Sequence, residues 1–247
     1  MTVKEILERC TIDAEEGILH LPHTTLDRKD YTDLKKQLEM IGGKWNRYKD
    51  GFVFQSDPTA LVELLKSGEP VDLKKKFQFF GTPYKVAELL TDYLSRIRTS
   101  DKVLEPSAGQ GALIQAVRRE NPNVTVDCFE LMDINRLVLK HVEGANLIGD
   151  DFMAAEPQPI YDKIIMNPPF SRNQDIDHVK RAYEWLKDDG ELVAIMSMHW
   201  TFANDKKSVE FRQWCEEVEC LEMERLESGE FAESGTNIAA VIVRICK

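Results

Sequence analysis

A rigid polar tip is predicted where Asn167, Pro168, Pro169 and Phe170 follow the apolar residues 164–166. Because proline has no backbone N–H, two consecutive prolines should end a buried strand at this point. The tip would then hold one carboxamide, backbone carbonyls that are free of the sheet, and one aromatic ring. In an open α/β sheet, ligands bind outside the carboxyl ends of the strands, which is where this tip would lie. We therefore expect chemistry at residues 167–170.

A second candidate segment, residues 102–119, reads as a strand, a glycine turn and a helix. Gly109 and Gly111 let the backbone approach a ligand closely, and the first turn of the helix offers N–H groups. The spacing is not the G-x-G-x-x-G of dinucleotide-binding proteins, and no Lys-Ser or Lys-Thr pair follows as in a P-loop. Glu105, at the end of the expected strand, would repel a phosphate. It therefore favours a ligand with an amino or cationic group.

Acidic residues also follow the next two expected strands. Glu130 lies roughly 20 residues beyond the glycine turn, a position at which an acid can bind ribose hydroxyls. Asp150, Asp151 and Phe152 follow the third strand. Because ligands bind outside the carboxyl ends of the strands in an open α/β sheet, we expect these side chains and the tip to meet at one edge.

The elements that would position these residues alternate between strand and helix. Strands are expected at 102–105, 124–131, 145–150, 161–166 and 191–198, followed by a closing pair at 220–226 and 237–246. Helices are expected at 83–97, with Thr82 as N-cap and Pro83 as first residue, and at 112–119, 176–190 and 211–218. This order predicts an α/β fold with a doubly wound, mostly parallel seven-stranded sheet and an antiparallel last strand.

Residues 1–76 are predicted to form a separate small α+β module, and residues 77–247 the α/β domain. The first 76 residues are nearly neutral, with 13 Lys and Arg against 14 Asp and Glu, whereas the whole chain has a formal net charge of −11. A hairpin is expected at 44–54, with Asp50 and Gly51 at its turn. It should lie between a helix capped by Asp30 and a helix that begins after Asp57.

The expected hairpin interleaves cationic and aromatic side chains. This mixture is typical of a nucleic-acid contact, because bases stack on rings and phosphates pair with cations. A second interpretation is that Trp45, Phe52 and Phe54 form the core of a small module. Both can hold, since alternate residues of a strand face opposite ways. The candidate contact residues are Lys44, Trp45, Arg47, Tyr48 and Lys49.

The composition argues against several classes of protein. No apolar segment approaches the roughly 18 residues of a membrane span, and the N-terminus lacks a signal-peptide core. The five cysteines are far apart and form no CxxC motif, so we expect no metal site and reduced thiols in the cytoplasm. A net charge of −11 disfavours a protein that coats nucleic acid non-specifically, although a local basic cleft is compatible with it.

Taken in order, Glu105-Pro-Ser-Ala-Gly-Gln-Gly111, Glu130, Asp151-Phe152 and Asn167-Pro-Pro-Phe170 resemble the motifs of class I S-adenosylmethionine-dependent methyltransferases. The segment Phe80-Gly-Thr-Pro83 stands ahead of the glycine motif, which is similar to the gamma-type order of the DNA enzymes that methylate adenine N6. The resemblance covers roughly residues 77–247. It implies S-adenosyl-L-methionine as cofactor, a nucleic-acid substrate with DNA favoured over RNA, no metal and no membrane.

The resemblance also implies which residues contact the cofactor. Phe80, Thr82 and Pro83 would line the site of its methionine end, and Glu130 would hold the ribose hydroxyls. Asp150 or Asp151 would accept from the adenine amino group, with Phe152 against the ring. The glycine motif would wrap the cofactor, with Glu105 towards its amino group, and Asn167 would belong to this set as well. The glycine-motif residues are Glu105, Pro106, Ser107, Ala108, Gly109 and Gly111.

For the reaction, the resemblance implies an exocyclic amino group as acceptor. An amine conjugated to an aromatic ring is a poor nucleophile because its lone pair is delocalised. The Asn167 side-chain oxygen and the Pro168 carbonyl would accept its N–H groups, the prolines would hold these acceptors rigid, and Phe170 would stack on the base. A base in a duplex must be flipped out to reach such a site. His199 and Trp200 would either wall the base pocket or simply pack.

The family pattern leaves the substrate open. DNA enzymes of this order usually carry a target-recognition region after the catalytic core, and none is evident here. Recognition is therefore expected to come from residues 1–76 or from a partner, or to be weak. Adenine N6 in DNA is the first expectation, followed by adenine N6 or guanine N2 in ribosomal or transfer RNA. Further alternatives are the N5 of a protein glutamine and a non-catalytic binding subunit that keeps the fold.

Overall fold

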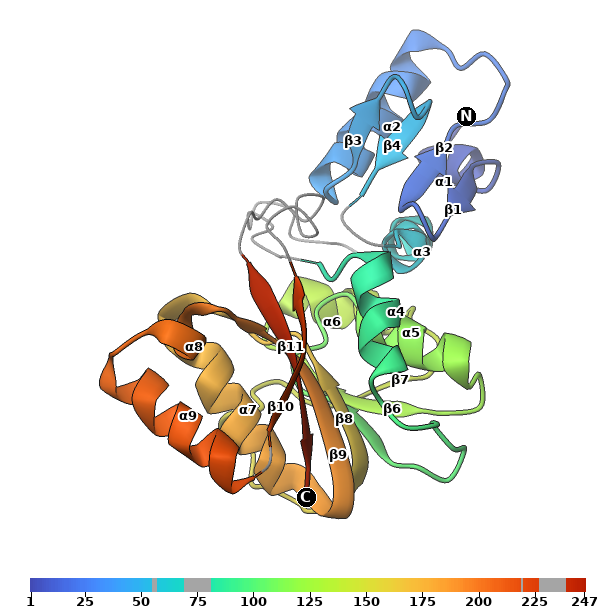
Figure 1. The fold of residues 1–247 in the computed structure, drawn as a ribbon. Helices are drawn as coiled ribbons and strands as arrows, with labels where there is room; N and C mark the ends of the chain where they lie inside the picture. Colours follow the sequence, from blue (N-terminus) through green and yellow to red (C-terminus); the bar gives the residue numbers. More distant parts are fainter. Residues whose placement is uncertain (55–56, 69–80, 219, 227–238) are drawn as a thin grey trace.

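The computed structural model describes residues 1–54, 57–68, 81–218, 220–226 and 239–247, which fall into a small antiparallel part and a larger α/β part (Figure 1). The small part has the strand order β1-β2-β4-β3, with every pair antiparallel. Its elements are α1 (Val3–Leu7), β1 (Thr11–Asp13), β2 (Ile18–His20), α2 (Arg28–Met40), β3 (Lys44–Asn46), β4 (Gly51–Val53) and α3 (Thr59–Ser67).

The predicted hairpin is present as β3 and β4, and Asp50 at its turn has a left-handed backbone with φ of 45°. The predicted cap of α2 is wrong. Asp27 is the N-cap, and its carboxylate accepts the backbone N–H of Asp30 at 2.8 Å. Strand β1 was not predicted, because its three residues are too short to show an alternating pattern.

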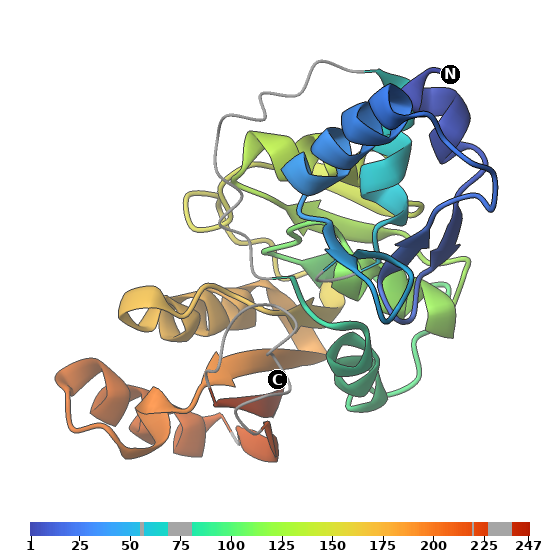
Figure 2. The ribbon, with the colours of Figure 1, turned by 90° about the horizontal axis from the view of Figure 1, so that it is seen from above.

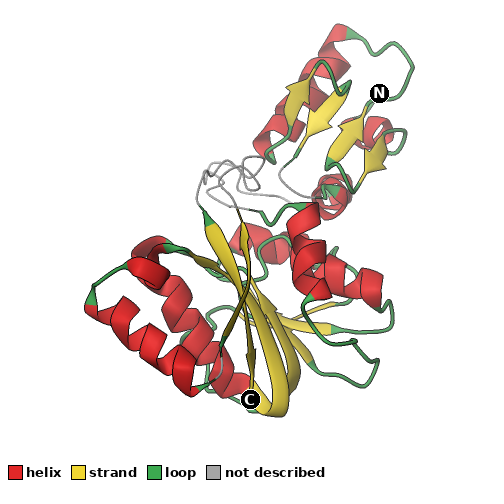
Figure 3. Ribbon diagram, in the orientation of Figure 1, coloured by secondary structure: helices red, strands yellow, loops and turns green. Residues whose placement is uncertain are grey.

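The larger part is a seven-stranded sheet in the order β10-β11-β9-β8-β5-β6-β7, with helices on both faces (Figure 3). Neighbouring strands from β9 to β7 are parallel, and β11 is antiparallel to both β9 and β10. The predicted fold class is therefore confirmed. The elements are α4 (Tyr84–Asp92), β5 (Val103–Glu105), α5 (Ala112–Glu120), β6 (Val126–Phe129), α6 (Asp133–Leu139), β7 (Ala145–Gly149), β8 (Tyr161–Met166), η1 (Ser171–Asn173), α7 (Gln174–Trp185), β9 (Leu186–Ser197), α8 (His199–Phe202), α9 (Lys206–Glu217), β10 (Leu221–Leu226) and β11 (Ala240–Cys246).

Alternation along the central strands divides the core between the two faces of the sheet. In β8, Ile165 belongs to the hydrophobic cluster under α4, α5 and α6, whereas Ile164 and Met166 belong to the cluster under α7 and α9. The same alternation holds in β11, where Ile242 faces the first cluster and Val241 the second. Successive strand residues point to opposite faces, so strands buried on both sides read as continuous apolar segments.

The chain order creates a switch point between β5 and β8. From β5 the chain builds outward through β6 and β7, and then returns to place β8 on the other side of β5. The loops after β5 and β8 therefore leave the sheet in opposite directions. A crevice opens between such loops, and it is where open α/β sheets bind their ligands.

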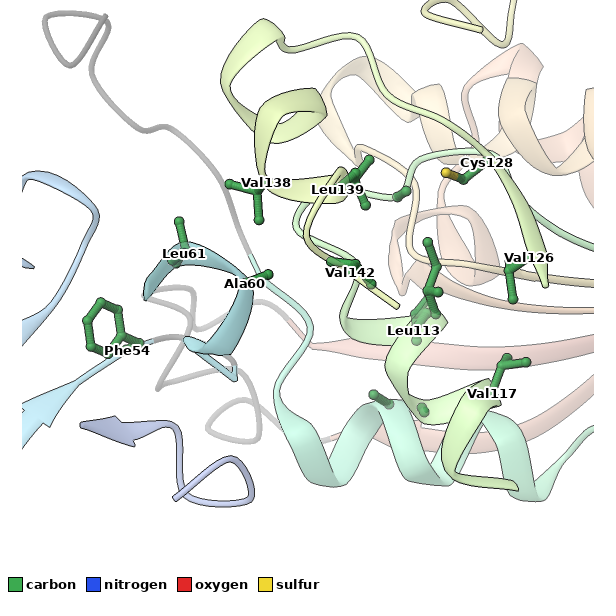
Figure 4. Packing of buried hydrophobic residues seen from close by; sticks show 14 of the residues in the cluster. Phe54, Ala60, Leu61, Leu113, Val117, Val126, Cys128, Val138, Leu139 and Val142 are labelled. Atoms are coloured by element: carbon green, nitrogen blue, oxygen red, sulfur yellow. The ribbon is translucent and has the colours of Figure 1, made fainter. Parts of the chain in front are cut away.

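The small part packs on the larger one through α3 and α6. Figure 2 shows α2 and α3 over the half of the molecule that holds α5 and α6, away from α8 and α9. Ala60 and Leu61 of α3 face the segment that carries Val138 and Val142 (Figure 4), and all four belong to one continuous hydrophobic cluster. The predicted boundary near residue 76 lies outside the described residues. The two-module division therefore stays a prediction.

A buried ion-pair network ties β8, β9 and β11 together. The Oε1 atom of Glu191 accepts from Lys163 Nζ and from the backbone N–H and hydroxyl of Ser95, at 2.8 and 2.5 Å for the latter two. Its Oε2 atom accepts from the Arg244 guanidinium at 3.0 and 2.6 Å. Burial alone would raise the pKa of Glu191, but these hydrogen bonds outweigh it and lower the pKa to about 2.

Several predicted boundaries are wrong. Helix α4 ends at Asp92 rather than near Ile97, and its N-cap is Pro83 rather than Thr82. Strand β9 begins at Leu186, where the predicted helix was expected to continue. Helix α6 was not predicted at all. No helix in the described part of the chain is long and apolar enough to cross a membrane.

Candidate active site

A cavity of about 740 Å³ lies at the carboxyl ends of the parallel strands, at the switch point. Its volume is in the range of small-molecule and cofactor sites. Every parallel strand from β5 to β9 contributes to it. The lining residues come from the segments that follow these strands. After β5 they are Pro106, Ser107 and Gly109, and after β6 they are Glu130, Leu131, Met132 and, within α6, Asn135. After β7 they are Asp150, Asp151 and Phe152, after β8 they are residues 167–171, Asn173 and His178, and Ser197 and His199 come from the end of β9 and the residues beyond it.

Glu130 joins two of these loops. One carboxylate oxygen accepts the backbone N–H of Gly109 and the other that of Met132, both at 2.7 Å. Burial raises the pKa of Glu130, and these hydrogen bonds partly offset the increase. The carboxylate therefore orders the glycine turn while it also lines the cavity.

The two glycines of the turn have different roles. Both have left-handed backbones, with φ of 55° at Gly109 and 86° at Gly111. Gly109 lines the cavity, but a Cβ at Gly111 would lie 2.9 Å from the side chain of Val142. Gly111 therefore permits close packing after α6 rather than a contact with a ligand.

Glu105 is buried, with 1% of its surface exposed, and it does not line the cavity directly. Its Oε1 atom accepts the backbone N–H of Ser107, which does line the cavity, at 3.0 Å. Its Oε2 atom is buried without a hydrogen-bond partner among the described residues. Burial, reinforced by Glu130, raises the pKa of Glu105 well above its usual range despite the bond from Ser107. An unpaired buried carboxyl oxygen fits a ligand with an amino group, such as S-adenosylmethionine.

Residues 150–152, which follow β7, also line the cavity. Asp151 accepts the backbone N–H groups of Met153 at 2.9 Å and Ala154 at 3.3 Å, so its carboxylate holds a turn. Asp150 lies 3.4 Å from the Arg136 guanidinium. Phe152 is buried with its ring centroid 6.3 Å from that of His178. Asp150 and Asp151 thus bring carboxylates, and Phe152 an aromatic ring, to the lining of the cavity.

The tip after β8 is held by a residue that precedes α4. The Asn167 side-chain N–H₂ donates to the Thr82 hydroxyl at 3.0 Å. This bond leaves the carboxamide oxygen of Asn167 as an acceptor for the cavity. Pro168 is buried and Phe170 is half-buried, with one part packed against the hydrophobic cluster. The tip is therefore a preoriented set of acceptors beside an aromatic ring.

Several residues that line the cavity were not predicted. Ser197, at the end of β9, donates its backbone N–H and its hydroxyl to one oxygen of the buried Asp175, at 2.9 and 2.8 Å. Burial raises the pKa of Asp175, although these bonds lower it in part. His178 bonds the carbonyl of Gln174 through Nδ1 at 2.9 Å, so Nδ1 is the donor in this bond.

The structure brings together most, but not all, of the residues that the sequence singled out. Pro106, Ser107, Gly109, Glu130, Asp150, Asp151, Phe152 and residues 167–170 line one cavity. The predicted residues that do not line it are Thr82, Pro83, Glu105, Ala108 and Gly111, and Phe80 lies outside the described residues. The expectation that Trp200 walls the cavity is wrong. Trp200 is buried against Phe211, with ring centroids 5.0 Å apart, whereas its neighbour His199 lines the cavity.

The hairpin of the small part presents most of its candidate residues to solvent. Lys44, Trp45, Arg47 and Tyr48 are exposed, and Tyr48 is fully so. Lys49 pairs with Glu16 at 2.9 Å. Phe52 and Phe54 are buried, so the core interpretation holds for these two, while Trp45 meets Phe52 only through an edge-on ring contact of 5.2 Å. A groove of about 310 Å³ runs beside Trp45.

Among the described residues, no group of three or more His, Cys, Asp or Glu side chains is placed to hold a metal ion. The arrangement instead combines hydrogen-bond acceptors, ordered loops and aromatic faces.

Two curated proteins match parts of this chain. The type II methyltransferase M.AccI of Acinetobacter calcoaceticus is 27% identical over 109 residues, which is 42% of this chain and 20% of that protein. The tRNA1(Val) (adenine(37)-N6)-methyltransferase of Aliivibrio fischeri is 31% identical over 100 residues, which is 38% of this chain and 43% of that protein. The match thus spans less than half the length of either relative.

Solved structures share the fold of the larger part of this chain. The methyltransferase subunit of a type I restriction-modification system from Streptococcus thermophilus superposes with a TM-score of 0.56 and 18% identity, over 68% of this chain and 45% of that one. A geranyl diphosphate methyltransferase in complex with S-adenosylmethionine superposes with a TM-score of 0.50 and 8% identity, over 66% of this chain and 85% of that one. At these identities the likeness shows the fold alone.

The family is shown by sequence. The profile of the methyltransferase small domain matches residues 84–214, more than half of the chain, from the start of α4 into α9. The geranyl diphosphate methyltransferase of the same fold was solved with S-adenosylmethionine bound. The cavity, its glycine turn and its Asn-Pro-Pro-Phe tip lie within the matched segment. The chain therefore belongs to the methyltransferase small domain family.

Proposed function

We propose that this protein methylates an exocyclic amino group of a nucleobase, and that its substrate is adenine N6 in DNA. The observation that carries the proposal is the hydrogen bond from Asn167 to Thr82, at the edge of a cavity that also holds Glu130 and the glycine turn. It directs a carboxamide oxygen towards the place where an amino group would be accepted. S-Adenosylmethionine supplies the methyl group.

The residues of the tip would each have one task. The Asn167 oxygen and the Pro168 carbonyl accept the two N–H groups of the acceptor amine, which draws its nitrogen towards tetrahedral geometry and frees its lone pair. Phe170 stacks on the base. Because these acceptors are already in place, no reorganisation is needed as charge develops on the nitrogen. A flipped-out base would enter the cavity past the loop after β8.

The cofactor would occupy the other side of the cavity. Glu130 would bind the ribose hydroxyls, and Asp151 or Asp150 would accept from the adenine amino group with Phe152 against the ring. The unpaired oxygen of Glu105 supports a role for this residue towards the amino group of the cofactor. Thr82 and Asn167 would stand between the two sites, since one bond links them.

DNA is favoured by the relative that is named a type II methyltransferase and by the fold of a type I restriction-modification subunit. A second candidate is adenine N6 in RNA, which is favoured by the match to a tRNA adenine-N6 methyltransferase. The exposed cations and rings of the β3–β4 hairpin support contact with either polymer. We propose that residues 1–76 act as a nucleic-acid contact module.

Methyl transfer from tritiated S-adenosylmethionine to DNA, RNA and protein, in parallel reactions, tests the proposal. We expect label in DNA, and N6-methyladenine in its nucleoside digest. Label in RNA would show that the substrate is RNA, the second candidate. N2-methylguanine in the digest, or label on a protein glutamine, would show that adenine is not the methylated group. Asn167→Ala should abolish transfer but keep cofactor binding. If Asn167→Ala left transfer unchanged, the tip would not be the acceptor site.

A further inference from the structure

Two consecutive residues just beyond the tip have left-handed backbones. Arg172 and Asn173 have φ values of 58° and 56°, a region that favours glycine and is tolerated by asparagine. They form the end of η1, which joins residues 167–170 to α7. Ser171 and Asn173 line the cavity. A strained turn therefore lies in the cavity wall, between the tip and the helix that follows it.

Lys207, from the first turn of α9, holds this turn. Its ammonium donates to the backbone carbonyl of Asn173 at 2.5 Å, to that of Arg172 at 3.4 Å, and to the carboxylate of Asp177 at 2.6 Å. An ammonium has three N–H donors, so each one has an acceptor here. Both left-handed residues are thus bound through their carbonyls by a single side chain.

A second contact joins the same two elements. Asp205 is the N-cap of α9, and its carboxylate accepts the Asn173 side-chain N–H₂ at 3.4 Å. The other carboxylate oxygen lies 3.3 Å from Nε2 of His199. Asn173 and His199 both line the cavity, and they come from the loops after β8 and β9. The start of α9 therefore fixes two walls of the cavity relative to each other.

The position of the tip depends on this turn. The backbone N–H of Asn173 donates to the carbonyl of Phe170, the last residue of the tip, at 3.1 Å. A change of φ at Asn173 would therefore alter this hydrogen bond. The cofactor side of the cavity is built differently, because Glu130 and Gly109 are held by hydrogen bonds within the loops after β5 and β6. A substitution of Lys207 should therefore change the geometry of the Asn167–Phe170 tip but not that of Glu130 and Gly109.

We propose that Lys207 is a positioning residue, which keeps Arg172 and Asn173 left-handed and thereby places the Asn167–Phe170 tip for methyl transfer. The proposal rests on the assignment of this tip as the acceptor site. It differs from that assignment because Lys207 touches neither the acceptor nor the cofactor side of the cavity. Its contribution is to the geometry of the tip, on which in-line transfer depends.

Lys207→Met removes the ammonium, and Lys206→Met is the matched control. Lys206 is the preceding residue on α9, its side chain is 88% exposed, and its ion pair is with Glu210 at 3.7 Å. We expect Lys207→Met to lower kcat by about 10- to 100-fold, with the Kd of S-adenosylmethionine unchanged. Lys206→Met should equal the wild type, and Lys207→Arg should recover part of the loss because it keeps the charge and several donors.

A double variant distinguishes release of strain from general damage. Glycine adopts the left-handed region freely, so Arg172→Gly in the Lys207→Met background should restore much of kcat. If the double variant were as slow as Lys207→Met alone, Lys207 would not act by keeping Arg172 in its left-handed conformation.

Hydrogen exchange gives a readout that needs no substrate. Amides of residues 170–176 should exchange faster in Lys207→Met than in Lys206→Met, while those of α5 should not change. Equal exchange and equal kcat in the two variants would overturn the inference. A wild-type protein that transfers no methyl group to DNA or RNA would overturn the proposed function instead, and the exchange comparison would then decide the role of Lys207 by itself.

Discussion

The side chain of Asn167 donates to the hydroxyl of Thr82, a residue 85 positions earlier in the chain, at 3.0 Å. The bond fixes which end of the carboxamide faces the cavity. Without it, the carboxamide could rotate and present N–H groups, which would repel an amine's own N–H groups. Thr82, two residues before α4, thus determines which end of the Asn167 carboxamide faces the cavity at the end of β8.

Thr82→Val should therefore lower kcat/KM for methyl transfer by roughly 3- to 10-fold, the value of one hydrogen bond. Valine keeps the shape of threonine and removes the acceptor. Thr82→Ser keeps the acceptor and should retain most of the activity. Steady-state kinetics on the methylated substrate give the comparison, and equal losses for valine and serine would show that the bond does not orient Asn167.

Glu105→Gln should stabilise the protein and weaken cofactor binding. Burial raises the pKa of Glu105 well above its usual value, so the folded state holds a proton that the unfolded state has lost. Stability is then lost as pH rises from about 4.5, the ordinary pKa, towards the raised one. We expect the variant to gain about 1–3 kcal/mol in the free energy of unfolding at neutral pH.

Urea unfolding between pH 5 and 8 measures this difference, which should grow with pH, and calorimetry measures the cofactor Kd. Glu120→Gln, at the exposed end of α5, is the control. A Glu105→Gln protein that binds S-adenosylmethionine as tightly as the wild type would remove Glu105 from the cofactor site.

Glu191→Gln should have the opposite effect on stability. The variant leaves Lys163 and Arg244 without their carboxylate, and breaking a buried pair in this way costs about 3–5 kcal/mol. Because the pKa of Glu191 is lowered to about 2, its contribution is complete above about pH 4.5 and is lost as pH falls towards 2. Chemical denaturation of both proteins between pH 2.5 and 7 should show a difference that shrinks on acidification. Glu210→Gln on the surface of α9 should show none.

The hairpin cations should contribute to nucleic-acid affinity but not to cofactor affinity. Lys44→Gln and Arg47→Gln should each weaken DNA binding for all sequences alike, and each lost phosphate contact should reduce the slope of log K against log salt by about 0.9. Trp45→Ala should cost about 1–3 kcal/mol if a base stacks on it. Fluorescence anisotropy over a salt series measures these effects. Lys35→Gln on α2 is the control, and an equal loss there would indicate a general charge effect.

The sequence predicts the ends of the strands well because the residues there are of distinctive types. Glycine, proline and acidic residues are easily recognised after an apolar segment. The sequence alone therefore places Gly109, Glu130 and residues 167–170 at the strand ends that line the cavity. His178 and Ser197 could not be. His178 lies one turn inside an ordinary amphipathic helix, and Ser197 is a small residue at the end of a buried strand. Only the packing of α7 on β9 places both at the cavity.

Two errors have the same physical origin. Thr82 before Pro83 is a strong local cap signal, but its hydroxyl is used by Asn167 instead. Trp200 is the larger ring beside His199, yet successive residues of a helix face different directions, and α8 turns the tryptophan inward. In both places a tertiary contact overrides a local preference, and no local pattern reports such a contact.

The position of β11 also determines when this half of the molecule can fold. Residues 221–226 are made before residues 240–246, yet β10 meets the rest of the sheet only through β11. Until β11 has been added, β10 has no neighbour in the sheet and β9 is an open edge. A ribosome that stalled before residue 240 would therefore hold a nascent chain with its central strand β9 exposed. Such an edge can pair with another chain, so this interval of synthesis carries a risk of aggregation.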